Sequence, residues 1–600
     1  MRLRAVTTAA LAATVVGAFL VGPAQAEPRQ LERSPVAVGV GGAVATVDPE
    51  ATRVGVEVLR KGGNAVDAAI ATAATLGVTE PFSSGIGGGG FLVFYDARTG
   101  RVHTIDGREA APASMTGTAF INPATGSPYG FDEARVSGIS VGVPGSPATW
   151  SEALTRWGTT SLAEALRSAI QVADRGFVVD STFQSQIAAN TAIFGQFDST
   201  SALYLPGGQP PAVGSVFRNR DLAQTYRDLS QRGVDELYRG AIAGDIVQTV
   251  QHPPLAADPI GTWTHPIRPG GMQLSDLSSY GVRLPEPTHV GYRGLDIYGM
   301  PTPSSGGQAV GEALNILETS DIGGLSRTQA LHRYLEASAL AFADRNRYVG
   351  DFTPRALLDE LLSDGFAKDR ACQIDPAKAL VKPVNPGVPD GSYGACQVAP
   401  LCPPATAGMS TTNLTVADQW GNVVEYTLTI EQTGGNGMVV PGRGFLLNNE
   451  LTDFNFAPTQ CGAPDPNLPA PGKRPRSSMS PTIVLRDGEP FLAVGSPGGS
   501  TIITTVLQIL VNRVDLGMTL PEAIAAPRAT QRNTAAVQAE PGFAPDQPAL
   551  AALGHVFTPN PEIGAATGVE FLSDGRLLAV AEPTRRGGGA AGVVQSVGTP

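Results

Sequence analysis

The chain has 600 residues, of which 42% are hydrophobic, and carries a formal net charge of −12. This length and apolar content can supply a large folded core, and the acidic balance argues against nucleic acid or an anionic membrane surface as a partner. Glycine (72 residues) and proline (49 residues) are abundant but follow no repeat period, which excludes a collagen-like chain or a low-complexity array.

Residues 1–26 have the pattern of a secretory signal. Arg2 and Arg4 supply the positive end, residues 9–21 form the apolar run, and Ala24-Gln25-Ala26 is a small-residue cleavage site. The apolar run is too short to span a membrane comfortably. We therefore expect cleavage after Ala26 and secretion to the extracellular space, or to the periplasm or cell envelope. An uncleaved membrane anchor is the alternative.

Two helices and a glycine-rich strand entry follow. Residues 49–76 have helical spacing interrupted by Gly62-Gly63, and Asn64 is placed to cap the second helix. Residues 85–90 match the GxGxxG pattern, but the next residues, 91–95, read as a strand. A dinucleotide site needs a helix there, so we reject that interpretation.

Residues 138–142 match the GxSxG pattern of a nucleophile elbow. The elbow requires a helix directly after its serine, whereas Pro144 and Pro147 follow here and would obstruct one. We interpret this segment as a loop. Beyond it, residues 148–251 are predicted to be mostly helical, and a long helix is predicted over residues 327–349. Residues 351–410 are rich in Pro, Gly, Ala and Cys, which predicts an exposed segment leading to a processing site.

The stretch 410–431 is predicted to form two strands joined by a tight turn. If paired residue numbers sum to 840, Leu414 faces Tyr426 and Thr411 faces Thr429, whereas a sum of 841 breaks the apolar face. The even sum leaves a short loop in which Gly421 can take a positive φ. The pattern thus places two threonine hydroxyls side by side. A polar strand face rich in threonine for its strand propensity alone is the other interpretation.

Several motifs resemble those of γ-glutamyltransferases (γ-glutamyl transpeptidases), which are N-terminal nucleophile hydrolases. They are Gly62-Gly63-Asn64-Ala65-Val66-Asp67-Ala68-Ala69, Glu80-Pro81 with the glycine run, Thr411-Thr412-Asn413, Thr427-Leu428-Thr429, Gly444-Phe445-Leu446-Leu447-Asn448-Asn449, Lys473-Arg474-Pro475-Arg476-Ser477-Ser478, and Gly495-Ser496-Pro497-Gly498-Gly499-Ser500. They run from about residue 40 to 530 and are specific in combination.

The resemblance implies an α+β fold, a four-layer αββα sandwich. It also implies that the chain cuts itself at the Ser410-Thr411 bond into a large subunit (27–410) and a small subunit (411–600), which together form one domain. Thr411 is then the nucleophile. Its new α-amine, with an ordinary pKa of about 7.7–8.0, serves as the base, and Thr429 orients the hydroxyl.

The resemblance also assigns the groups around the substrate. Gly498 and Gly499, at the start of a predicted helix, would donate N–H groups to the oxyanion. Arg108, Ser477 and Ser478 would hold the α-carboxylate of a γ-glutamyl donor. The donor's α-amino group would meet three acids: Glu431, Glu450 and Asp453.

No metal or other cofactor is expected. The six histidines are scattered without ligand spacing. The 327–349 helix also has residues that resemble the family but look structural: His332, Glu336, Asp344, Arg345 and Tyr348. The expected partners are small molecules: glutathione or other γ-glutamyl compounds, with water, amino acids or peptides as acceptors.

Four cysteines, Cys372, Cys396, Cys402 and Cys461, suggest disulfides in an oxidising compartment. Three precede the cleavage bond and one follows it. Every complete intramolecular pairing therefore joins Cys461 to the large subunit, although the sequence cannot choose among the three pairings.

Two other functions compete with this prediction. A cephalosporin-type acylase on the same fold would take glutaryl groups that lack the α-amine, and the three acids argue against it. A secreted binding protein that never cleaves itself is the non-enzymatic alternative, and the intact nucleophile and glycine pair argue against that.

Overall fold

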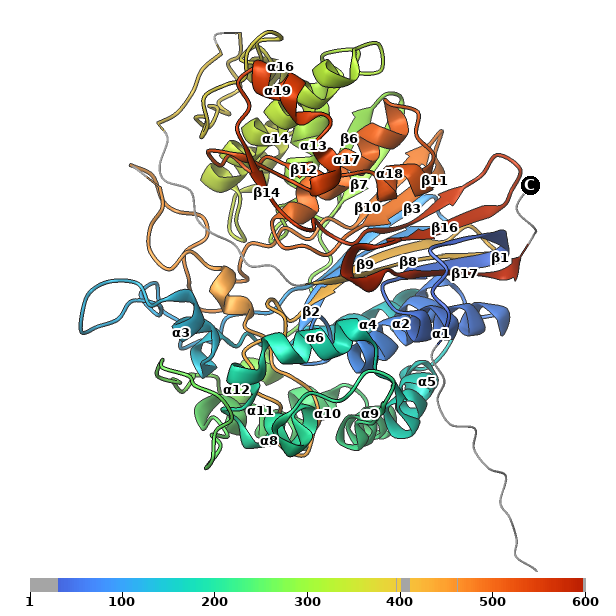
Figure 1. Ribbon diagram of the computed structural model, residues 1–600, viewed down its shortest axis with the longest axis vertical. Coiled ribbons are helices and arrows are strands. Elements are labelled where there is room, and N and C mark those ends of the chain that lie inside the picture. Colours follow the sequence, from blue (N-terminus) through green and yellow to red (C-terminus); the bar gives the residue numbers. More distant parts are fainter. Residues whose placement is uncertain (1–30, 395, 401–410, 461, 597–600) are drawn as a thin grey trace, which may run out of the picture.

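The protein is a four-layer αββα sandwich, in which two β-sheets lie face to face and helices cover both outer faces (Figure 1). The structure is a computed structural model that describes residues 31–394, 396–400, 411–460 and 462–596. The predicted signal segment, Ser410, Cys402 and Cys461 lie outside the described residues. Among the helices that are described, none combines the length and the apolar character that a membrane crossing requires. The predicted fold class is confirmed.

The first sheet contains the predicted nucleophile hairpin. Its strands, in spatial order, are β3 (Arg101–Gly107), β2 (Gly89–Asp96), β9 (Val423–Thr429), β8 (Thr412–Asp418), β1 (Val36–Thr46) and β17 (Ala590–Ser596).

The second sheet starts from the other half of β1. Its further strands, in spatial order, are β16 (Leu577–Ala581), β15 (Thr567–Phe571), β11 (Glu489–Gly495), β10 (Thr482–Arg486), β7 (Leu295–Gly299) and β6 (Thr288–Tyr292).

Strand β1 links the two sheets by bending at Gly41 and Gly42, whose φ angles are 85° and 134°. Before the bend, residues 36–39 pair with β16, and after it residues 42–46 pair with β8. Both angles lie in the region that favours glycine. These two glycines therefore allow one strand to belong to both layers.

The β8–β9 hairpin has the predicted register. Leu414 pairs with Tyr426 and Val416 with Val424, so that paired numbers sum to 840. The Gly421 φ of 89° in the turn is also as predicted. The register is confirmed for the paired residues, and the same sum of 840 would set Thr411 opposite Thr429 one step further along.

Helices of the first outer layer come from the N-terminal half of the chain. Those that pack on the first sheet are α1 (Pro49–Arg60), α2 (Ala65–Thr79) and α4 (Ser146–Trp157), with α5 (Leu162–Arg175) behind them. The others are α3 (Phe131–Arg135), η1 (Gly138–Ser140), α6 (Ser181–Ala189), α7 (Thr191–Phe194), α8 (Asp198–Tyr204), η2 (Pro206–Gly208), α9 (Arg220–Arg232), α10 (Asp235–Tyr238), α11 (Ala241–Gln251) and α12 (Leu274–Ser278).

Helices of the opposite layer come from both predicted subunits. They are α13 (Gly306–Glu318), α14 (Arg327–Tyr348), α15 (Arg355–Leu361), α16 (Asp364–Ala371), α17 (Thr501–Val514), α18 (Leu520–Ala525) and α19 (Gln547–Ala552). Short 3-10 helices are η3 (Glu450–Asp453), η4 (Pro541–Phe543) and η5 (Arg585–Gly587). Small sheets of β12 (Ala529–Thr530), β13 (Val537–Ala539) and β14 (Phe557–Pro559), and of β4 (Phe177–Val178) and β5 (Val216–Phe217), complete the fold.

Along each inner strand, successive side chains point alternately into two different cores. In β2, Phe91 and Val93 point into the core that includes the second sheet, while Leu92 and Phe94 point into the core beneath α1 and α2. This period of two follows from the strand pleat. Asn64 caps α2 as predicted, accepting a hydrogen bond from the N–H of Asp67 at 3.0 Å.

The segment after residue 350 is more structured than predicted. We expected an exposed stretch leading to the cleavage site, but α15 and α16 form there and bury Leu361 and Phe366. A disulfide between Cys372 and Cys396, with Cα atoms 6.1 Å apart, closes this region. Both helices are short, and burial of Leu361 and Phe366 stabilises them.

Candidate active site

Thr411 directly precedes β8 and is 3% exposed. It continues the alternation of Asn413 and Thr415, both of which hydrogen-bond to Thr567 in the second sheet at 2.9 and 3.0 Å. Its position therefore lies on the side of the first sheet that faces the second. The carbonyl of Thr411 accepts a hydrogen bond from Arg586, which also donates to Ser83 Oγ at 2.7 Å.

Thr429, at the end of β9, is fixed by the chain that follows it. Its Oγ1 accepts a hydrogen bond from the N–H of Glu431 at 2.8 Å. Glu431 has a φ of 76°, which is uncommon for a residue with a side chain. The Glu431 carboxylate accepts a hydrogen bond from Asn449. The tight turn thus brings a predicted substrate-binding acid next to the predicted catalytic hydroxyl.

The glycine pair lies in a loop that starts beside the hairpin. A Cβ at Gly495, the end of β11, would lie 2.3 Å from Glu425 Oε1 and 2.5 Å from Asn413 Oδ1. This close approach sets the loop against the strand that follows Thr411. Gly498 and Gly499 have φ angles of 136° and 57° and lead into α17.

No hydrogen bond from the N–H of Gly498 or Gly499 to another backbone group is formed within the described part of the chain. A nearby anion could therefore accept from them. Backbone donors that remain available to an anion are one requirement of an oxyanion hole.

The structure brings Arg108 together with two of the three predicted acids. Arg108 is 1% exposed and forms ion pairs with Glu450 and Asp453 from η3. Its Nε donates to the carbonyl of Pro475 at 3.1 Å. Arg108, predicted to bind the α-carboxylate, therefore lies next to two acids predicted to bind the α-amino group. Such adjacency is required because an amino acid has both groups on one carbon.

Burial dominates the electrostatics of these acids. It raises the pKa of Glu450 to about 7, against the opposing effect of Arg108. Burial, with the charges of Asp453 and Glu450, raises the pKa of Glu431 well above its ordinary value. A cation entering between these carboxyl groups would favour their charged forms.

Ser477 and Ser478 lie on the segment that Arg108 holds through Pro475. The Ser477 Oγ accepts from the N–H of Met479 at 3.1 Å, and the Ser478 Oγ accepts from Arg345 at 2.8 Å. Both serines are buried. Arg345 belongs to the predicted long helix, which is confirmed as α14.

Two further residues at this site, Arg586 and Glu109, were missed by sequence reasoning, and Arg345 was interpreted as structural. Arg586 and Arg345 are brought in from distant elements, and Glu109 adjoins Arg108. Both carboxyl oxygens of Glu109 are buried without a hydrogen-bond partner among the described residues, and burial together with the Glu450 charge raises its pKa. Only the adjacency of Glu109 to Arg108 was visible in the sequence.

One buried group of His and Glu side chains has ligand atoms within 4.8 Å of one another in the part of the chain that the structure describes: His332, Glu336 and His555. The ring of His332 contacts His555 at 2.8 Å and the carbonyl of Asp375 at 2.9 Å. Lys382 already donates to Glu336. Because a lysine ammonium occupies this carboxylate, we assign no metal to the group.

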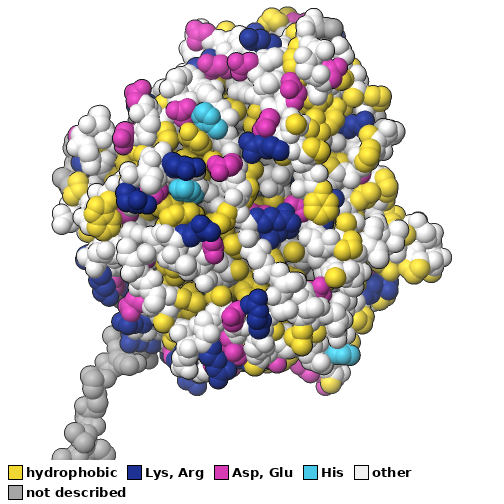
Figure 2. Space-filling model, turned by 180° about the vertical axis from the view of Figure 1, so that it is seen from behind, with side chains coloured by type: hydrophobic (Ala, Val, Ile, Leu, Met, Phe, Trp, Pro, Cys, Tyr) yellow, Lys and Arg dark blue, Asp and Glu magenta, His cyan; other side chains and the backbone are white. Residues whose placement is uncertain are grey.

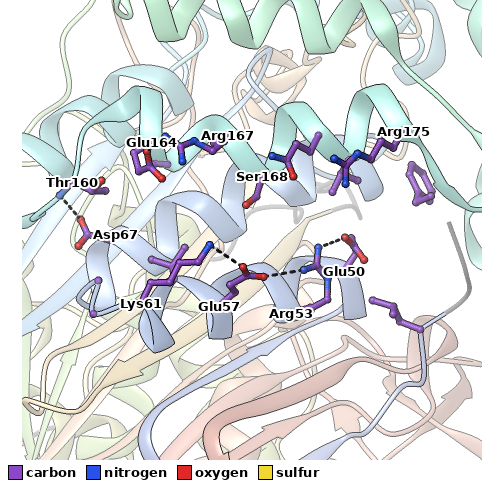
Figure 3. Close-up of a pocket in the computed structure, with 18 of the residues that line it drawn as sticks. Glu50, Arg53, Glu57, Lys61, Asp67, Thr160, Glu164, Arg167, Ser168 and Arg175 are labelled. Carbon is purple, nitrogen blue, oxygen red and sulfur yellow. Dashed lines mark hydrogen bonds and ion pairs between the residues drawn. The ribbon is translucent and has the colours of Figure 1, made fainter. Parts of the chain in front are cut away.

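A groove of about 650 Å³ lies between α1 and α5, with charged side chains along both walls (Figure 3). Glu57 pairs there with Lys61 at 2.8 Å and with Arg53 at 3.2 Å. None of the predicted site residues lines it. On the face seen from behind, acidic and basic side chains are also interspersed (Figure 2). The paired charges of the groove indicate a solvated surface.

The αββα sandwich places the protein in the class of N-terminal nucleophile hydrolases. A family model described as gamma-glutamyltranspeptidase matches residues 51–592, and the chain belongs to this family.

Similar proteins carry two kinds of name. The chain is 37% identical to a glutathione hydrolase proenzyme of Bacillus subtilis (strain 168), covering 93% of this chain and 92% of that protein. It is 34% identical to the acylase ACY 1 proenzyme of Pseudomonas sp. (strain V22), covering 92% and 93%. A crystal structure of a cephalosporin acylase from Bacillus halodurans superposes with a TM-score of 0.79 at 28% identity, covering 96% of this chain and all of that one.

Proposed function

We propose that the protein is a secreted, self-processing γ-glutamyltransferase that cleaves γ-glutamyl amides such as glutathione without a cofactor. Cleavage of the Ser410-Thr411 bond would release the α-amine of Thr411 and divide the chain into subunits 27–410 and 411–600. Before cleavage that nitrogen is an amide and cannot act as a base. Processing would therefore switch the enzyme on.

In the proposed reaction, the Thr411 hydroxyl attacks the γ-carbonyl carbon while its α-amine takes the hydroxyl proton. Thr429 orients the hydroxyl, and the N–H groups of Gly498 and Gly499 stabilise the oxyanion. The C–N bond then breaks, and the amine leaves with the proton. Water or an amino compound next attacks the Thr411 ester and releases the γ-glutamyl product.

The observation that carries this proposal is the charge arrangement at the donor end. Arg108 lies between Glu450 and Asp453, with Glu431 and Glu109 buried nearby. Arg108 pairs with Glu450 and Asp453, whereas neither Glu431 nor Glu109 forms an ion pair among the described residues. A donor with both an α-carboxylate and an α-ammonium would complete the arrangement, because a buried charge needs a partner.

An acylase acting on glutaryl amides is the second candidate. It is favoured by the resemblance to the cephalosporin acylase structure and to the acylase ACY 1 proenzyme. A glutaryl group would leave the acids without their cation. A secreted binding protein that does not process itself is the remaining alternative.

The test combines chain cleavage with two substrates. We expect the wild-type protein to give a fragment beginning at Thr411 and to hydrolyse a γ-glutamyl anilide at a kcat/KM at least about tenfold above that for the glutaryl anilide. Thr411→Ala is expected to stay as one chain without activity. Intact mass and anilide release measure both.

Thr412→Val is the matched control, because the Thr412 hydroxyl is buried without a partner among the described residues. Thr412→Val is expected to cleave its own chain and to turn over substrate. Equal kcat/KM for the two anilides would establish the acylase instead. Absence of both cleavage and turnover in the wild type would favour the binding protein.

A further inference from the structure

Several arginines near the donor site form no ion pair among the described residues, and three of them are Arg345, Arg476 and Arg532. Arg345 is 5% exposed, and within the described chain its hydrogen bonds go to neutral oxygens: Ser305 Oγ at 2.9 Å, Asn346 Oδ1 at 2.9 Å and Ser478 Oγ at 2.8 Å.

Arg532 contacts the residue that follows the Gly498-Gly499 pair. It follows β12, and one of its terminal nitrogens donates to Ser500 Oγ, directly after the glycine pair. The other donates to Gln538 Oε1 at 2.8 Å. Its Nε is buried and has no hydrogen-bond partner in the described chain. One donor of this half-buried guanidinium therefore has no partner, and it lies beside the loop that would bind the oxyanion in the proposed reaction.

The charges of these arginines act on one another. Burial is the largest cause that lowers the pKa of Arg345 well below its ordinary value. The positive charges of Arg476 and Arg532 lower this pKa further, and the negative charge of Asp453 opposes them. Arg345 lies on α14, and Arg532 lies between β12 and β13, in contact with Ser500 at the start of α17. The labels α14, β12 and α17 are all in the upper half of Figure 1. Like charges that approach each other in the interior are costly unless an anion offsets them.

Arginines with a structural role in the same region are paired. Arg528, four residues before Arg532, contacts Glu582 at 2.9 Å, and Arg585 contacts Glu540 and Glu582 at 2.5 and 2.7 Å. The chain thus supplies acids where arginines serve only to hold the fold. At Arg532 it supplies a serine and an amide.

We propose that Arg532, flanked by Arg345, forms a second anion subsite that binds a carboxylate on the amine half of the substrate. This inference rests on the proposed function. The leaving amine and the acceptor amine occupy the same place in turn, because each is bonded to, or attacks, the same carbonyl carbon. The subsite would therefore favour amino acids and peptides over neutral amines both as leaving groups and as acceptors.

The test uses two donors that differ in one carboxylate: a γ-glutamyl anilide and the corresponding γ-glutamyl carboxyanilide. In Arg532→Gln, we expect kcat/KM for the carboxyanilide to fall about tenfold more than that for the anilide, as for a lost charge-assisted contact. Arg532→Lys, which keeps the charge, is expected to recover part of the wild-type ratio of kcat/KM for the carboxyanilide to kcat/KM for the anilide. Chain cleavage into two fragments shows that each variant has folded.

Arg327→Gln is the matched control, because it removes one positive charge from the start of α14, where Arg327 is half-exposed and paired with Asp546. For Arg327→Gln, the ratio of kcat/KM for the carboxyanilide to kcat/KM for the anilide is expected to equal that of the wild type. An equal fall for both donors in Arg532→Gln would overturn the subsite and leave the proposed function standing. A wild-type protein that cleaves neither donor would overturn the proposed function itself.

Discussion

At the scale of single residues, the donor site contains Glu450 and Glu431, two buried acids whose pKa values are raised by burial. Arg108 and Glu450 are both 1% exposed, and each depends on the other for its charge. Burial raises the pKa of Glu450 to about 7 even with this arginine beside it. The negative charge offered to a donor's ammonium group should therefore vary over the ordinary working range of pH.

We predict that Glu450 makes donor capture dependent on pH. Below a pH of about 7 the carboxyl group is protonated and loses its attraction for the ammonium, whereas above that pH it is charged and attracts it. The ratio of kcat/KM for the wild type to that for Glu450→Gln is expected to rise as the pH increases through about 7. The Thr411 amine titrates in both proteins and cancels in the ratio. A ratio that stays flat between about pH 6 and 8 contradicts this role.

At the scale of elements, the hairpin that carries Thr411 was predictable because its pattern is local. Strand period, a three-residue turn and one glycine determine the register, and the structure has the pairing of Leu414 with Tyr426. The two N-terminal helices and the long α14 were predictable for the same reason, since capping residues and helical spacing mark them.

What could not be predicted depends on long-range packing. Arg586 reaches Thr411 from 175 residues away, and Arg345 reaches Ser478 across 133 residues. His332 and His555 are 223 residues apart in sequence and in contact in the fold. No spacing rule links residues on different elements, and the family resemblance supplied the site residues that local patterns could not.

We predict that the hairpin's apolar face governs its stability. Leu414 is fully buried against Tyr426, so Leu414→Ala in a Thr411→Ala background is expected to lower the free energy of unfolding by about 2–5 kcal/mol. Trp420, 53% exposed in the turn, is the control, and Trp420→Ala should change it by less than about 0.5 kcal/mol. The urea midpoints of the single-chain proteins measure both. Similar losses would show that the register does not depend on this face.

At the scale of the whole molecule, the disulfide between Cys372 and Cys396 narrows the pairing that the sequence left open. Both cysteines belong to the proposed large subunit. Cys402 and Cys461 then remain for a second bridge, although both lie outside the described residues. That bridge would connect the two proposed subunits.

We predict that the mature protein runs as one band of full mature mass on denaturing gels without reductant and as two bands with it. Thiols are blocked before denaturation to prevent exchange. Cys461→Ser is expected to give two bands under both conditions, while Cys372→Ser tests the other bridge and keeps the one-band pattern. Two bands from the unreduced wild type would rule out a covalent link between the subunits.

The bent strand β1 also determines when the molecule can be completed. Its three partners, β8, β16 and β17, all lie after residue 411, and two of them belong to the last 25 residues of the chain. During synthesis the edges of β1 stay unpaired until its partner strands, two of which lie near the end of the chain, have been made. Such non-local pairing is slow and exposed to aggregation. Until the partners pair, an intact chain keeps β1 covalently linked to them. Cutting the chain before the sandwich closes would turn the last folding step into an encounter between two separate molecules.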